Sequence, residues 1–207
     1  MKKSLLSIVA TIALAGMANA GSVVFDNFSG TFSQIQANGV AIPAGTGFVA
    51  VGTTALTVND LAAELVFGEL SIAGRDALAA SFVQFGAGVQ FGFSGNAGYF
   101  QGNAQGDGGA AAFAGKPVIL VAGNGTGIAD SSSLLIITGT DNFAADGPVF
   151  STNVGPDAGQ VIFGAAGGTN SIAEAFGAVQ MGNVVPEPGV SILALLSAGI
   201  IFLRRRR

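Results

Sequence analysis

Two uncharged apolar runs near the ends of the chain limit how much of it can enter one folded domain. The first covers residues 5–16, behind Lys2 and Lys3, and the second covers residues 190–203, in front of four consecutive arginines. Apolar runs flanked by such charges are typical of segments that meet the export machinery or lipid. The folding problem is therefore that of residues 21–184, which hold most of the glycine and phenylalanine.

The N-terminal run has the features of a signal peptide. A basic start precedes an apolar stretch of the expected length, and Ala18 and Ala20 form a small-x-small site. We therefore expect residues 1–20 to be removed, with cleavage between Ala20 and Gly21. An uncleaved N-terminal anchor is the alternative interpretation.

The C-terminal run predicts a single transmembrane helix. Its length as a helix is roughly 21 Å, which is short against a hydrocarbon core of about 30 Å but adequate with local thinning of the bilayer. The positive-inside bias predicts that the basic block stays cytoplasmic, with the N-terminus outside. Pro186 and Pro188 disfavour helix just before the run, so Glu187 is expected to be extended and exposed.

The sequence Val-Pro-Glu-Pro at 185–188, followed by the apolar run and the arginines, resembles the PEP-CTERM sorting signal over residues 185–207. The resemblance implies processing by an exosortase, a membrane-embedded cysteine protease or transpeptidase. It also implies delivery to the cell surface or the exopolysaccharide matrix of a Gram-negative bacterium. The sorting motif would be Pro186, Glu187 and Pro188, and the stop-transfer block would be Arg204, Arg205, Arg206 and Arg207. An ordinary C-terminal anchor with an incidental proline pair is the alternative.

The charge of the body argues against nucleic acid as a partner. Arg75 and Lys116 are its only cations, against eleven carboxylates, so its net charge is −9. Binding of nucleic acids and other polyanions depends on lysine and arginine. An acidic surface suits an exported protein, or one that meets divalent cations.

Residue types that are absent restrict the chemistry of the body. The chain has no histidine, cysteine or tryptophan, which excludes Ser-His and Cys-His pairs, disulfides and the usual zinc ligand sets. It also lacks a G-x-S-x-G elbow and a phosphate-binding P-loop. We expect a non-catalytic protein. A secreted enzyme acting on polysaccharide through paired carboxylates is the less favoured alternative.

Short apolar runs separated by glycine-rich turns predict a mainly β domain over residues 21–184. The predicted strands are 23–25, 48–51, 83–93 as a bent strand or hairpin, 117–122, 134–138, 149–150, 160–163 and 178–181. Helices are expected at 57–67 and 171–176, with a helical turn at 75–80. Residues 101–115 predict a mobile loop, and 123–133 a polar loop. The favoured architecture is a sandwich or irregular two-sheet domain with one or two short helices, and α+β is the alternative.

Calcium is the cofactor that the loops could hold, although we expect none. Asp130, Asp141, Asp146 and Asp157 lie between predicted strands, but their spacing fits no calcium motif, and solvated loop acids are the favoured interpretation. Tyr99 and Phe100 could form an exposed binding pair, although a core role is favoured. The expected function is a surface or matrix protein that is structural. Its partners would be exosortase, signal peptidase, the membrane and exopolysaccharide. A carbohydrate- or calcium-binding module is the alternative.

Overall fold

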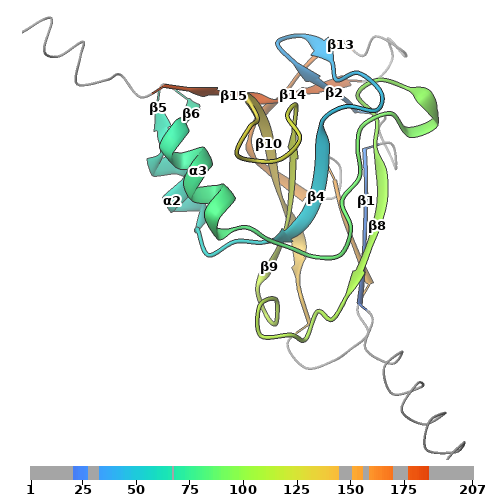
Figure 1. The fold of residues 1–207 in the computed structure, drawn as a ribbon, viewed down its shortest axis with the longest axis vertical. Helices are drawn as coiled ribbons and strands as arrows, with labels where there is room; N and C mark the ends of the chain where they lie inside the picture. Colours follow the sequence, from blue (N-terminus) through green and yellow to red (C-terminus); the bar gives the residue numbers. More distant parts are fainter. Residues whose placement is uncertain are drawn as a thin grey trace, which may run out of the picture.

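The computed structural model describes residues 21–27, 33–66, 68–144, 151–155, 159–169 and 177–186, and these form a mainly β fold with two short helices, as predicted (Figure 1). The expected signal peptide, the apolar C-terminal run, the strand at 149–150 and the helix at 171–176 lie outside these residues. Within the described part of the chain, no helix combines the length and apolarity needed to cross a bilayer.

An eight-stranded sheet forms the centre of the fold. Its order is β5 (Leu65–Val66), β6 (Glu69–Ser71), β15 (Gly182–Val185), β10 (Ser133–Asn142), β9 (Pro117–Gly123), β4 (Phe48–Thr53) and β7 (Val83–Gln84), and β12 (Gly159–Phe163) shares one edge of β10 with β15. Neighbouring strands are antiparallel except β15 and β6, which are parallel. Strand β10 is thus paired along both edges.

Strands β9 and β10 are buried on both faces, as their continuous apolar sequences predicted. In β9, Leu120 enters one hydrophobic core and Val121 enters a second core on the opposite face. In β10, Leu135 and Ile136 divide between the same two cores in the same way. The central sheet therefore needs a covering layer on each side.

Two smaller sheets contribute to the first core. One has the order β11 (Ser151–Val154), β1 (Gly21–Asp26) and β8 (Gln101–Gly106), and the other has β13 (Ala165–Thr169), β14 (Gly177–Gln180), β2 (Gln34–Ala37) and β3 (Val40–Ala41). Phe25 of β1 and Ile35 of β2 pack into the same cluster as Leu120. The described strands thus form three sheets rather than the expected two. The parallel pairs β1–β11 and β2–β14 join segments far apart in sequence.

Helices cover the opposite face, where Leu61 of α2 (Val58–Ala63) and Leu78 of α3 (Ile72–Ser81) enter the second core (Figure 1). Helix α2 is shorter than the predicted 57–67, because Leu65 reaches the same core from strand β5. Thr57 caps α2: its hydroxyl accepts from the N–H of Asp60, whose carboxylate accepts from the Thr57 N–H and hydroxyl, as in a capping box. These donors, the backbone one first, lower the pKa of Asp60.

Helix α3 begins three residues before the predicted helical turn at 75–80. Ser71 is its N-cap and accepts a hydrogen bond from the N–H of Gly74 at 2.9 Å. The Ser71 hydroxyl also donates to the carboxylate of Glu64 at 3.1 Å, which ties the helix start to the end of α2. Gly74 in the first turn lowers the helix propensity of this segment, so the sequence does not indicate where the helix begins. The Ser71 cap defines its start.

The prediction of a mobile loop at 101–115 is wrong for its first half. Residues 101–106 form β8, which pairs antiparallel with β1 along all six residues. Gly102 lies opposite Phe25 and has no side chain, so the fully buried ring of Phe25 packs directly on the β8 backbone. A glycine that suggests a loop in the sequence therefore leaves room for an aromatic ring to pack on the strand backbone.

The rest of that segment is anchored by an aromatic cluster. The ring of Phe113 lies 5.2 Å from that of Phe85 and 5.1 Å from that of Phe143, measured between centroids. In addition, the N–H of Phe143 donates to the main-chain carbonyl of Lys116 at 2.8 Å. Residues 107–116 are thus a turn-rich connection packed on the core.

The bent strand or hairpin expected at 83–93 forms only in part. The segment pairs with β4 in two places, at β7 and at a bridge between Val49 and Val89, and is irregular between them. Phe85 and Phe91 are buried, but Val83 and Phe93 of the predicted apolar faces are 42% and 38% exposed. A turn of 3-10 helix at Phe93–Gly95 follows. Tyr99 and Phe100 are buried, which confirms their core role.

Candidate functional site

Two places in the described part of the chain bear on function, and the first is the end of β15 with the residue that follows it. Strand β14 is not the last strand, because β15 follows it and pairs with β6, with Val185 opposite Ser71. The N–H of Val184 donates to the carbonyl of Ser132 at 2.9 Å. Pro186 directly follows and is exposed. Glu187, Pro188 and the four arginines lie outside the described residues.

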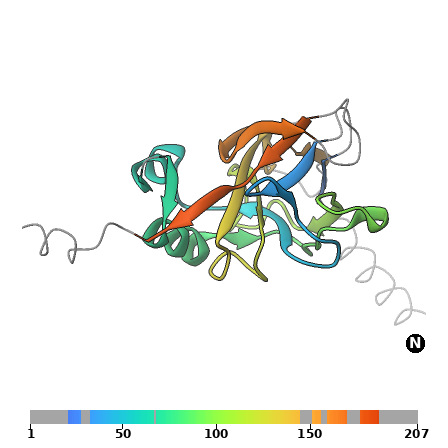
Figure 2. The same ribbon diagram turned by 90° about the horizontal axis from the view of Figure 1, so that it is seen from above.

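The expected first residue after signal cleavage, Gly21, is the first residue of β1. It is buried and pairs with Gly106 at the end of β8. Figures 1 and 2 place β1 and β15 on opposite sides of the fold, with β15 ending beside the helices. Ala18 and Ala20 lie outside the described residues.

The calcium candidates that the structure describes have separate environments. Asp130 caps its own loop: its Oδ2 accepts from the hydroxyl and N–H of Thr126 at 2.6 and 2.9 Å, and its Oδ1 accepts from the Gly127 N–H at 2.7 Å. These bonds, led by the Thr126 hydroxyl, lower the pKa of Asp130 from 3.8 to about 2. Asp141 accepts from the Thr152 hydroxyl at 2.5 Å. Asp146 and Asp157 lie outside the described residues, among which no group of three or more acidic, histidine or cysteine side chains gathers.

Two asparagines that begin Asn-x-Ser/Thr sequences have structural roles that sequence reasoning missed. Asn27 is buried, and its amide donates to the carbonyls of Ser33 and Gly98 while its Oδ1 accepts from the Phe100 N–H. Asn124 accepts from the N–H groups of two consecutive serines, at 132 and 133. Asn27 joins segments that are far apart in sequence, and Asn124 closes the loop between β9 and β10. The side-chain amide of each is therefore already engaged in hydrogen bonds.

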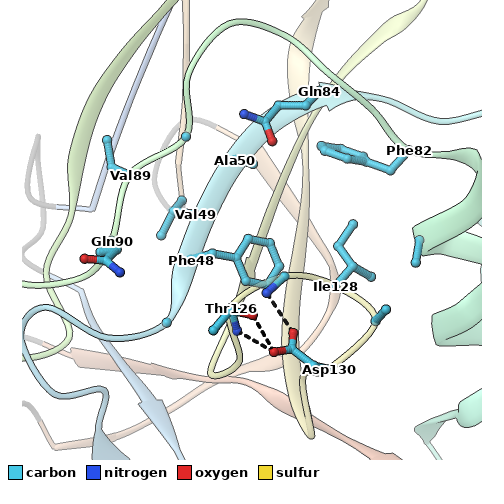
Figure 3. A pocket seen from close by; sticks show the side chains of 15 residues that line it. Phe48, Val49, Ala50, Phe82, Gln84, Val89, Gln90, Thr126, Ile128 and Asp130 are labelled. Carbon is cyan, nitrogen blue, oxygen red and sulfur yellow. Dashed lines mark hydrogen bonds between the residues drawn. The ribbon is translucent and has the colours of Figure 1, made fainter.

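The second place is a groove on the helix side of β4, with a volume of about 810 Å³. We call it the β4 groove. It lies between the end of α3, the irregular segment 84–90 and the loop 126–130 (Figure 3). Its lining side chains include two aromatic rings, two amides, a hydroxyl and a carboxylate: Phe48, Phe82, Gln84, Gln90, Thr126 and Asp130.

The groove exists because the residues of β4 that follow Phe48 on this face are small. Ala50 forms part of the floor, and Gly52 follows it on the same face. The ring of Phe48 packs over the backbone of Gly123 in β9, and the tip of Phe82 packs over Gly52. Both rings contact the second core, yet they are only half-buried. A larger residue than Ala50 would fill the space between them.

No protein-family model, curated protein or solved structure matches this chain. Its function must therefore be inferred from the residues of the tail and the groove. Among the residues of the groove, the sequence indicated only Asp130 as a candidate binding residue. An alternation of Phe48 with Ala50 and Gly52 was a signal for a face of β4 that is left incompletely covered.

Proposed function

We propose that this chain is an exported protein of the cell surface or extracellular matrix, sorted by an exosortase through residues 185–207, and that its body is structural and non-catalytic. The observation that carries the proposal is the Pro-Glu-Pro tag, followed by an uncharged apolar run and four arginines. The absence of histidine and cysteine supports a body without the common nucleophile–base pairs.

The geometry at the end of β15 supports processing at the tag. Strand β15 pairs with β10 through residues 182–183 and with β6 through residues 184–185, so the described strands are held in the sheet up to Val185. Pro186 is already exposed, which suits a protease that must bind its substrate as an extended segment. Cleavage beyond this residue would leave every described strand in place, and the body would keep its fold after release.

The other end supports the same proposal. Removal of residues 1–20 would leave β1 complete, since Gly21 is its first residue. The two expected processing points therefore bracket the described domain. Under this proposal the protein meets signal peptidase and exosortase during export, then exopolysaccharide outside the cell. It would have no nucleic-acid partner, because its body carries two cations against eleven carboxylates.

The test is intact-mass measurement of both ends of the natural protein in envelope and medium fractions. We expect an N-terminus at Gly21 and loss of Arg204 to Arg207. Replacing both Pro186 and Pro188 by alanine should leave a membrane-bound precursor. The control Pro43→Ala changes an exposed proline far from the tag in sequence, and this variant should be processed normally. A mature form that keeps the arginines, or a reporter fused after Phe163 that stays cytosolic, would refute the proposal.

A further inference from the structure

We propose that the β4 groove binds a segment of uncharged polysaccharide. The inference builds on the proposed function, because extracellular glycan is what a surface protein meets, but the argument for the ligand class comes from the groove itself. Ligand sites commonly measure about 300–1,000 Å³ and combine apolar walls with a few placed polar groups. The β4 groove, at about 810 Å³, has this size and this mixture.

The walls present aromatic surface that the core does not use. Phe25, Phe85, Phe91, Phe100 and Phe143 are all buried to below 2% exposure. Phe48 and Phe82, by contrast, remain half-buried and border the groove on either side of Ala50 (Figure 3). The faces of aromatic rings carry partial negative charge, which attracts the polarised C–H groups on one face of a sugar ring. Two such rings beside a small floor residue favour a flat, partly apolar ligand.

The rim presents groups that pair with hydroxyls. The Gln84 amide donates to the carbonyl of Gly86 at 2.9 Å, which orients its carboxamide at the edge of the groove. Gln90, which also lines the groove, is exposed. On the other side, Asp130 is held in place by three hydrogen bonds and remains an exposed acceptor. Amides donate and accept, and a carboxylate accepts several bonds, so this set suits a ligand rich in hydroxyl groups.

The charge of the lining selects against anionic glycans. Asp130 is the charged residue among those that line the groove, and neither Arg75 nor Lys116 is part of the lining. Arg75 is engaged by the Asp76 carboxylate at 2.7 Å. A uronic acid or sulfated sugar would be placed near Asp130 without a compensating cation, and like charges at short range repel. The ligand is therefore an uncharged glycan.

A peptide added as an extra strand does not fit this position. The outer edge of β4 is already occupied, because Val49 and Val89 exchange both of their main-chain hydrogen bonds at 2.7 and 2.8 Å. The N–H of Phe85 also donates to the carbonyl of Val51. Strand addition needs an unpaired edge. What the groove offers is side-chain surface on the sheet face, which a sugar chain can use.

The test is calorimetric titration of the purified natural protein with hexasaccharides of uncharged sugars (β-1,4-glucan, β-1,3-glucan and β-1,4-mannan) and with hexamers of alginate. We expect saturable binding of at least one uncharged hexamer and none of alginate. Phe82→Leu keeps an apolar side chain but removes the ring, and Gln84→Ala removes an exposed amide. Each should weaken binding about 10-fold, the loss of one or two good contacts.

The controls are Phe93→Leu and Gln101→Ala, which alter an exposed ring and an exposed amide outside the groove. They should bind as the natural protein does, and all four variants should remain folded, with a single cooperative thermal transition; Phe82→Leu should lower the midpoint modestly, because the Phe82 ring also contacts the second core. The inference fails if no uncharged hexamer binds at millimolar concentration, if alginate binds equally well, or if Phe82→Leu leaves affinity unchanged. It also fails if the groove variants abolish self-association instead, which would make a second copy the occupant. A protein that is processed normally but binds no glycan would refute this inference alone. A protein that binds glycan but is not processed at its C-terminus in the cell would refute only the sorting proposal.

Discussion

Replacing Gly102 by alanine tests whether a phenylalanine ring needs a glycine opposite it in order to pack on the strand backbone. A Cβ at this position would lie 2.6 and 2.7 Å from the Cε2 and Cε1 atoms of Phe25, and its Cζ is closer still. Phe25 has no exposed surface and packs against Phe100, with centroids 6.3 Å apart, so its ring has no room to retreat. Overpacking of a core costs about 1–3 kcal/mol.

A smaller effect opposes this cost, because alanine loses less backbone entropy than glycine on folding, by about 0.5–1 kcal/mol. The net expectation for Gly102→Ala is a loss of about 1–2 kcal/mol, or about 2–8 °C in thermal midpoint for a body of this size. Urea unfolding followed by far-UV circular dichroism, together with calorimetry, would measure both quantities. Gly177→Ala is the matched control, because a Cβ there meets nothing within 4 Å.

A double-mutant cycle identifies the cause. Phe25→Leu removes the ring, so adding Gly102→Ala to that variant should cost much less than adding it to the natural protein. We expect a coupling energy of at least about 1 kcal/mol between the two positions. Equal costs in both backgrounds, or a Gly102→Ala variant as stable as Gly177→Ala, would refute the reasoning.

Three further predictions follow from single residues. Asn27→Ala should cost about 2–4 kcal/mol in urea unfolding, because it leaves the buried carbonyls and N–H that Asn27 contacts without partners. The folded pKa of Asp130, about 2, is below its ordinary value of 3.8, so the stability that its carboxylate contributes is present above about pH 4 and is lost as the pH falls towards 2. In Asp130→Asn the thermal midpoint should therefore vary less with pH over this range. A midpoint that varies with pH as much as in the natural protein would contradict the bonds from Thr126. Phe113→Ala should cost about 2 kcal/mol and speed proteolysis within 107–116, since it removes two ring contacts; uncut protein would contradict the anchoring by Phe143.

The sequence predicted the β-rich class and the two strands at the centre of the fold. Residues 117–122 and 134–138 are continuous apolar runs, and such runs require burial on both faces wherever they are placed. The polar loop between them was also confirmed, because residues 124–132 form turns and bends that connect β9 to β10. Pro117 at the start of β9 also fits, because a proline there lacks an N–H only at the end of the ladder.

The same reasoning failed for β8 and for residues 83–93. Hydrophobic periodicity reports where a residue's own side chain goes, and Gly102 has none, so the packing of β8 at this position depends on Phe25 from another strand. In 83–93 the alternation is real, yet Val83 and Phe93 are exposed because the segment pairs with β4 only at two points. A local pattern cannot indicate which partner strand is present or where its pairing is interrupted.

What the sequence alone determined is local chemistry: two apolar runs with basic flanks, a Pro-Glu-Pro tag, an acidic body without histidine or cysteine, and strands that must be buried. What only the tertiary structure decided is how distant segments meet. The pairing of β1 with β11, the three bonds of Asn27 and the β4 groove each join parts of the chain that lie far apart. The physical reason is that a pairing between distant strands, or a hollow between a helix, a strand and a loop, depends on closing long loops, and no single segment carries that information.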